Sequence, residues 1–83
     1  MKFYVTLNHY TAGSGFKFSE SFDKGTCENA FSASEYIAEN GIETDTDDGW
    51  IEVDIAFYSD DADPAFDAPV AVSVFNNTVA AMF

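Results

Sequence analysis

The chain has 83 residues, 47% of them hydrophobic and 17% aromatic, which is enough apolar surface for one folded domain over residues 1–83 and excludes a disordered chain. Fifteen acidic residues and three lysines give a net charge of −12, which excludes nucleic acids and anionic membranes as direct partners. No apolar stretch is long enough to cross a membrane, and none follows Met1 as a signal peptide would, so we expect a cytoplasmic protein.

The N-terminal residues predict a β-hairpin. Residues 2–10 alternate between apolar and polar side chains, which is the period of a half-buried strand. Residues 11–15 have the Gly-rich composition of a loop, and residues 16–22 continue as a second strand with Phe16 and Phe18 toward the core. A loop this short joins antiparallel neighbours.

A helix is predicted next, over residues 26–40. Its apolar residues recur every three or four positions, Thr26 can cap its first turn, and Gly41 can end it in the left-handed conformation. Ser32 and Glu35 also match a capping box, so a later start of the helix remains open.

The second half of the chain predicts strands joined by acidic loops and one tight turn. In chain order these are an acidic loop at 43–49, a strand at 50–58, an Asp- and Pro-rich loop at 59–68, a strand at 69–75, a turn at Asn76-Asn77 and a strand at 78–83. The order β-β-α-β-β-β predicts an α+β fold, in which one helix packs on one face of an antiparallel sheet of about five strands.

The alternation within the strands and the apolar face of the helix predict which side chains form the core. Cys27 lies on that helix face and is interpreted as a small core residue. A reactive pair with His9, favoured by a position near the helix start, is the weaker alternative. The predicted core comprises Phe3, Val5, Leu7, Phe16, Phe18, Phe31, Ile37, Ile51, Val53, Ile55, Phe57, Val72 and Val74.

The charges are distributed unevenly along the chain. All three lysines lie in the first 24 residues, and residues 25–83 carry the 13 acids that remain after Glu20 and Asp23. Ten of these acids lie between Glu43 and Asp67. Because ordinary surfaces intersperse both signs, a long acidic segment without a base favours a functional surface over one that serves solubility alone.

The predicted strand at 50–58 places acids in a row. Glu52 and Asp54 share one face about 6.6–6.8 Å apart, a separation of the same order as that between successive phosphates of a nucleic acid. Trp50 shares that face, either as an aromatic anchor for a partner or as a cover for the sheet. With the loops at both strand ends, the candidate partner-binding residues are Asp45, Asp47, Asp48, Trp50, Glu52, Asp54, Asp60, Asp61 and Asp63. A second acidic face, on the predicted helix, would hold Glu28, Glu35 and Glu39.

The acids do not match a metal loop. Glu43, Asp45, Asp47 and Asp54 have the spacing of four EF-hand ligands, but Gly49 comes one position late and a strand follows, so we expect no bound metal. Carboxylate pairs can be chosen anywhere in so acidic a chain, and no Gly-rich phosphate loop is present. We therefore expect neither enzyme activity nor a cofactor nor a small-molecule substrate.

The acidic profile resembles that of the phage-encoded DNA-mimic inhibitors, which are the anti-CRISPR and anti-restriction proteins. The resemblance covers the whole chain: it is short, it has no base after Lys24, and its acids are concentrated over residues 43–67. It implies that the protein, as a monomer in a bacterial host cell, blocks the DNA site of a basic DNA-binding protein or Cas complex. Two alternatives stay open: an immunity protein or antitoxin that neutralises a basic toxin, and a domain of a salt-loving organism.

Overall fold

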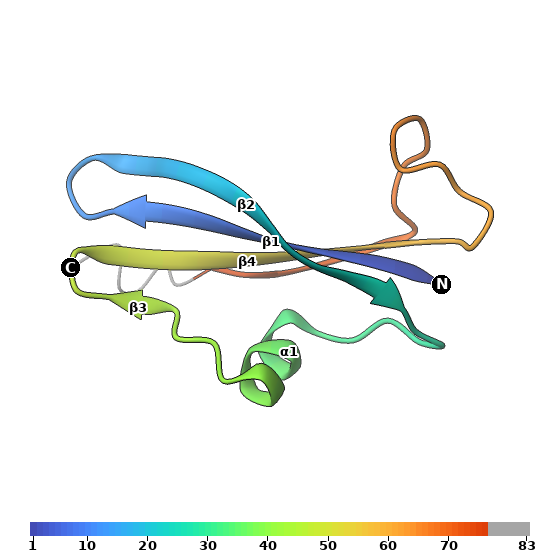
Figure 1. Ribbon diagram of the computed structural model, residues 1–83, viewed down its shortest axis with the longest axis horizontal. Coiled ribbons are helices and arrows are strands. Elements are labelled where there is room, and N and C mark those ends of the chain that lie inside the picture. The colour runs from blue at the N-terminus through green and yellow to red at the C-terminus, as the bar shows by residue number, and fades with distance from the viewer. Residues whose placement is uncertain (77–83) are drawn as a thin grey trace.

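The structure, a computed structural model, describes residues 1–76. Within them, five strands form one antiparallel sheet and a single helix packs against it, so the predicted α+β class is confirmed. The central strand β4 pairs with β1 along one edge and with both β3 and β5 along the other, and β2 lies outside β1 (Figure 1). The elements are β1 (Lys2–Thr11), β2 (Gly15–Thr26), α1 (Ala33–Asn40), β3 (Asp45–Thr46), β4 (Gly49–Tyr58) and β5 (Ala71–Phe75).

The hairpin of β1 and β2 is confirmed, but β2 runs four residues further than predicted, to Thr26. Its register shifts twice, between Val5 and Thr6 and between His9 and Tyr10 of β1, where β2 has an extra residue in each case. Each bulge reverses which side of the sheet the following side chains occupy. The simple alternation expected for this strand therefore does not hold.

The helix begins at Ala33, so the predicted start at residue 26 is wrong and the later start is right. The Ser32 hydroxyl accepts a hydrogen bond from the Glu35 amide, 3.1 Å away, as an N-cap. The segment before it is held in the sheet, since the Cys27 amide donates to the Met1 carbonyl at 2.8 Å. The end of the helix is as predicted: Gly41 has a φ of 62° and its amide donates to the Ile37 carbonyl.

The core lies between α1 and one face of the sheet, which we call the helix face. The buried members are Val5, Leu7, Ala33, Tyr36, Val53, Ile55 and Phe57. Partly buried residues that pack against them include Phe3, Phe31, Ile37 and Ile51, so these predicted core positions are confirmed. The odd-numbered side chains of β1 and β4 therefore point toward the helix, as their alternation indicates.

Four predicted core residues are wrong: Phe16, Phe18, Val72 and Val74 are all exposed. In β5, Ser73 lies opposite the buried Ile55, so the even-numbered valines point to the other face. In β2, the bulge at the hairpin end places Phe16 opposite Tyr10 and Phe18 opposite His9, so that the two rings lie on different faces.

Two further predictions meet the structure only in part. The acidic loop at 43–49 contains the short strand β3, which the sequence did not indicate. The strand at 78–83, and Asn77 of the turn before it, lie outside the described residues. Within residues 1–76, no helix has the length and apolar character needed to span a membrane.

Candidate binding surface

The face of the sheet opposite α1, which we call the Trp50 face, carries a row of side chains from four strands. Pairing places Phe16 opposite Tyr10, Tyr10 opposite Trp50, and Trp50 opposite Asp45, so their side chains share this face. The Tyr10 and Trp50 rings are stacked, with centroids 5.3 Å apart and an interplanar angle of 1°. The Phe16 ring meets Tyr10 edge-on at 5.7 Å. We call these three rings and Asp45 the aromatic row.

Glu52 and Asp54 stand next to the aromatic row on β4, on the same face as Trp50, as predicted. They are half-buried, because neighbouring side chains hold them. The Tyr10 hydroxyl donates to Glu52 Oε2 at 2.8 Å, and Asn8 Nδ2 donates to Asp54 Oδ2 at 2.6 Å. Ser19 Oγ in turn donates to Asn8 Oδ1. The second carboxylate oxygen of Asp54 is buried and accepts no hydrogen bond in the structure.

The hydrogen bond to Glu52 is the main reason that the pKa of Tyr10 is raised above its ordinary value. Burial and the charges of Glu52 and Asp54 act in the same direction, because each of them disfavours a second anion. Tyr10 therefore stays protonated as a donor throughout the neutral range. Its ring and its hydroxyl join the aromatic row to the acids.

Asp47 and Asp48 lie in the turn between β3 and β4 and are exposed. The turn is tied to the β1–β2 hairpin, since the Ala12 amide donates to the Asp48 carbonyl at 2.8 Å. Gly49 follows at a close approach of two chains, where a Cβ atom would lie 1.9 Å from the Tyr10 carbonyl oxygen. A residue with a side chain would push the strands apart, so glycine is required there.

The other predicted acids, Asp60, Asp61 and Asp63, lie at the opposite end of β4 (Figure 1). The ten residues of β4 span about 33 Å, so the nine candidate residues form two groups and not one patch. Asp60 is 3.2 Å from the N-terminal amine. Asp63 binds the amides of its own loop, its side chain accepting from Ala65 and its carbonyl from Phe66.

The lysines on the Trp50 face lie away from the aromatic row. Lys24 is opposite Tyr4 and Lys2 is opposite Tyr58, at the end of the sheet where the chain begins. Lys2 also donates to the Ala62 carbonyl at 3.0 Å. The face is therefore polarised, with carboxylates and stacked rings at the β3–β4 end and Lys2 and Lys24 at the other. Lys17 lies in the bulge between Phe16 and Phe18, and its amine is 5.9 Å from the centre of the Phe18 ring.

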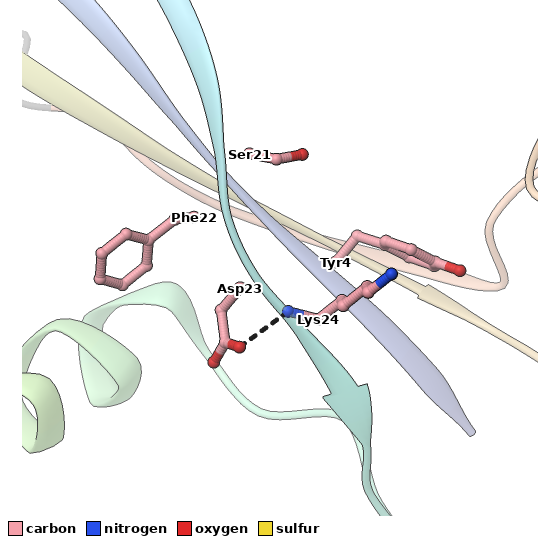
Figure 2. Close-up of a pocket in the computed structure, with 5 residues that line it drawn as sticks. All are labelled: Tyr4, Ser21, Phe22, Asp23 and Lys24. Atoms are coloured by element: carbon pink, nitrogen blue, oxygen red, sulfur yellow. Dashed lines mark hydrogen bonds between the residues drawn. The ribbon is translucent and has the colours of Figure 1, made fainter.

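Two hollows lie away from the aromatic row. One, of about 440 Å³, is lined by Tyr4 of β1 and by Ser21, Phe22, Asp23 and Lys24 of β2 (Figure 2). Its carboxylate has structural partners: Asp23 accepts from the Lys24 amide at 2.8 Å and from the Tyr36 hydroxyl at 2.7 Å. A second hollow beside Met1 is lined by Thr26, Cys27, Glu28 and Asp60.

The weaker alternatives from the sequence are not assembled by the fold. Cys27 is half-buried beside Met1 and lies before α1 begins, so the helix terminus expected to activate it is absent there. His9 lies about 25 Å away along β1. Its ring stacks on Phe18 and pairs with Glu20 at 2.9 Å. Within residues 1–76, no three His, Cys, Asp or Glu side chains converge in a way that could hold a metal ion.

Sequence reasoning missed Tyr10, Asn8 and Phe16 as parts of the surface. The alternation of the first strand places Tyr10 and Asn8 on the same face as Thr6, so the sequence did indicate their side of the sheet. Their contact with Glu52 and Asp54 depends on the pairing of strands far apart in the chain, which the alternation does not give. Phe16 reaches this face only through a bulge.

No protein-family model, curated protein or solved structure matches the chain. Function is therefore inferred from its own charges and geometry.

Proposed function

We propose that this protein binds a basic DNA-binding protein or Cas complex and occupies the site of its DNA, in the manner of anti-CRISPR and anti-restriction proteins. The observation that carries the proposal is the group of carboxylates at the β3–β4 end and in the middle of β4, in a chain with no base after Lys24. On this proposal the protein acts by binding and not by catalysis, in a bacterial host cell.

The magnitude and the sign of the net charge support the proposed function. A net charge of −12 on 83 residues destabilises the folded state through self-repulsion. We therefore expect the electrostatic field of the protein to have a function. A DNA site is lined by lysine and arginine, and a complementary field raises the rate of association with such a site. The same field repels DNA, so the protein would compete with DNA without binding it.

The shape supports it as well. The chain extends 41 Å in its longest dimension and only 17 Å in its shortest, with β4 running along the length (Figure 1). Acids stand in the turn before this strand and in its middle, at Glu52 and Asp54, so a basic channel would meet negative charge over the β3–β4 half of the molecule.

The fixed positions of Glu52 and Asp54 favour binding over a purely solubilising role. Acids that serve solubility alone are fully hydrated, whereas these two are half-buried and held by Tyr10 and Asn8. Carboxylates that are already fixed lose little entropy when a partner binds. An immunity protein for a basic toxin would use the same features, and the identity of the partner distinguishes the two functions.

The test is the survival of a targeted phage in bacteria that carry a CRISPR–Cas or restriction system. Expression of the protein should restore plaques, because the host effector can no longer bind the phage DNA. The informative variant is Asp47→Lys/Asp48→Lys, whose residues are exposed and distant from the core. Its control is Glu35→Lys/Glu39→Lys on α1, which changes the net charge equally on the other face of the sheet.

We expect the α1 variant to protect the phage and the turn variant to lose protection by about tenfold or more, since like charge would face the basic site. Equal protection by both variants would place the surface elsewhere. Absence of protection in every such strain, with survival of cells that express a basic toxin, would favour the immunity function.

A further inference from the structure

The aromatic row is not explained by charge mimicry, which requires carboxylates alone. Trp50 stacks on Tyr10, with Asp45 opposite it on β3 and Glu52 two residues along β4. These rings lie on the face opposite α1 and belong to neither the buried core nor the residues packed against it. The rings and acids together therefore indicate a partner group that is both cationic and planar.

The arginine side chain has both properties. Its guanidinium is flat, stacks on aromatic rings and donates two parallel hydrogen bonds to a carboxylate. A tryptophan face is the preferred partner for a stacked cation. A lysine ammonium is a hydrated point charge that gains less from such a site.

The charges on the rest of the Trp50 face restrict where the cation can lie. Lys2 and Lys24 occupy the end of this face where the chain begins, and would repel it. At the other end, Glu52 and the exposed turn acids Asp47 and Asp48 attract it. The hydroxyl of Tyr10 orients Glu52 through Oε2, and a carboxylate can accept further donors.

We propose that the β3–β4 end of the Trp50 face binds an arginine-bearing segment of the partner, with a guanidinium stacked on Trp50 and paired with Glu52. This inference rests on the proposed function and adds to it the chemistry of the contact. The carboxylates supply attraction to any cation, and the aromatic row selects arginine over lysine.

Trp50 is the only tryptophan of the chain, so its fluorescence reports on this site. The probes are an oligo-arginine peptide and an oligo-lysine peptide of equal length, titrated at low salt by calorimetry and by Trp50 emission. We expect the arginine peptide to bind about tenfold tighter and to change the emission at saturation. Trp50→Val should remove this preference, and Tyr58→Val, an aromatic loss at the lysine end of the same strand, should retain it.

Equal affinity for the two peptides with unchanged Trp50 emission would overturn this inference and leave the proposed function standing. Absence of binding to both peptides would overturn the proposed function as well. A dimer in analytical ultracentrifugation whose Trp50 emission follows protein concentration would assign the face to a second copy, and would also overturn the inference. If Trp50→Val fails to fold by circular dichroism, the comparison of the two peptides on the unaltered protein decides alone.

Discussion

Tyr10 and Trp50 lie parallel across β1 and β4, and the hydroxyl of the same tyrosine donates to Glu52. One side chain thus contributes both to the stack and to the position of a carboxylate. The two contributions can be separated, because phenylalanine keeps the ring and loses the donor.

We expect Tyr10→Phe to lower the free energy of unfolding by about 1 kcal/mol, the net value of one hydrogen bond. Tyr10→Leu should cost about 0.5–1.5 kcal/mol more, because the aromatic pair is also lost. Urea unfolding of both variants measures this. If Tyr10→Phe and Tyr10→Leu are equally stable, the stack with Trp50 contributes nothing.

Tyr36 makes stability depend on pH in the alkaline range. Burial, followed by the hydrogen bond to Asp23 and the charge of that residue, raises the pKa of Tyr36 to about 12 from the ordinary value of 10.0. The folded protein therefore holds this proton more tightly than the unfolded chain does. The resulting stabilisation is fully present below pH 10 and is lost as the pH rises toward 12.

Urea midpoints measured from neutral pH upward test this dependence. The control is Tyr36→Phe, which has no proton to lose, so the decline above pH 10 should be smaller in the variant. The lysines titrate in both proteins and cancel in the comparison. Parallel declines would mean that Tyr36 does not carry the effect.

The two faces of the sheet predict opposite outcomes for the same substitution. Val53 is 0% exposed and Val74 is 51% exposed, on the neighbouring strands β4 and β5. Val53→Asp buries an unpaired charge and should cost more than about 4 kcal/mol, which unfolds a domain of this size. Val74→Asp leaves the new charge in water but opposite Asp54, so it should cost no more than about 1 kcal/mol. Thermal melting followed by circular dichroism distinguishes them, and a stable Val53→Asp variant would contradict the placement of the core.

Much of the sheet could be predicted from local alternation. The predicted faces were wrong where pairing with a neighbouring strand decided which side chains point inward. The long run from Trp50 to Tyr58 alternates without interruption, so its two faces were assigned correctly. In β5, Val72 and Val74 suggested a core face, but pairing with β4 directs the other parity inward. Hydrogen bonds to a partner strand fix the face of a short strand more strongly than its own composition does.

The start of the helix shows the same competition between local and distant interactions. Thr26 is a good N-cap by type, yet its backbone pairs with Lys2 in the sheet. The capping pair of Ser32 and Glu35 was the local signal that predicted the start of the helix correctly. On the candidate surface, the shared face of Trp50, Glu52 and Asp54 was predictable, whereas the contribution of Tyr10 required the register between β1 and β4.

The proposed function makes competition with DNA the most direct measurement. Fluorescently labelled target DNA is bound to each of a panel of Cas surveillance complexes and restriction enzymes, and the purified protein is added. We expect it to displace the DNA from at least one of them. Displacement should weaken as salt rises, and Asp47→Lys/Asp48→Lys should need about tenfold more protein than Glu35→Lys/Glu39→Lys. Failure to displace DNA from any of them, or direct binding of the protein to the labelled DNA, would contradict the account.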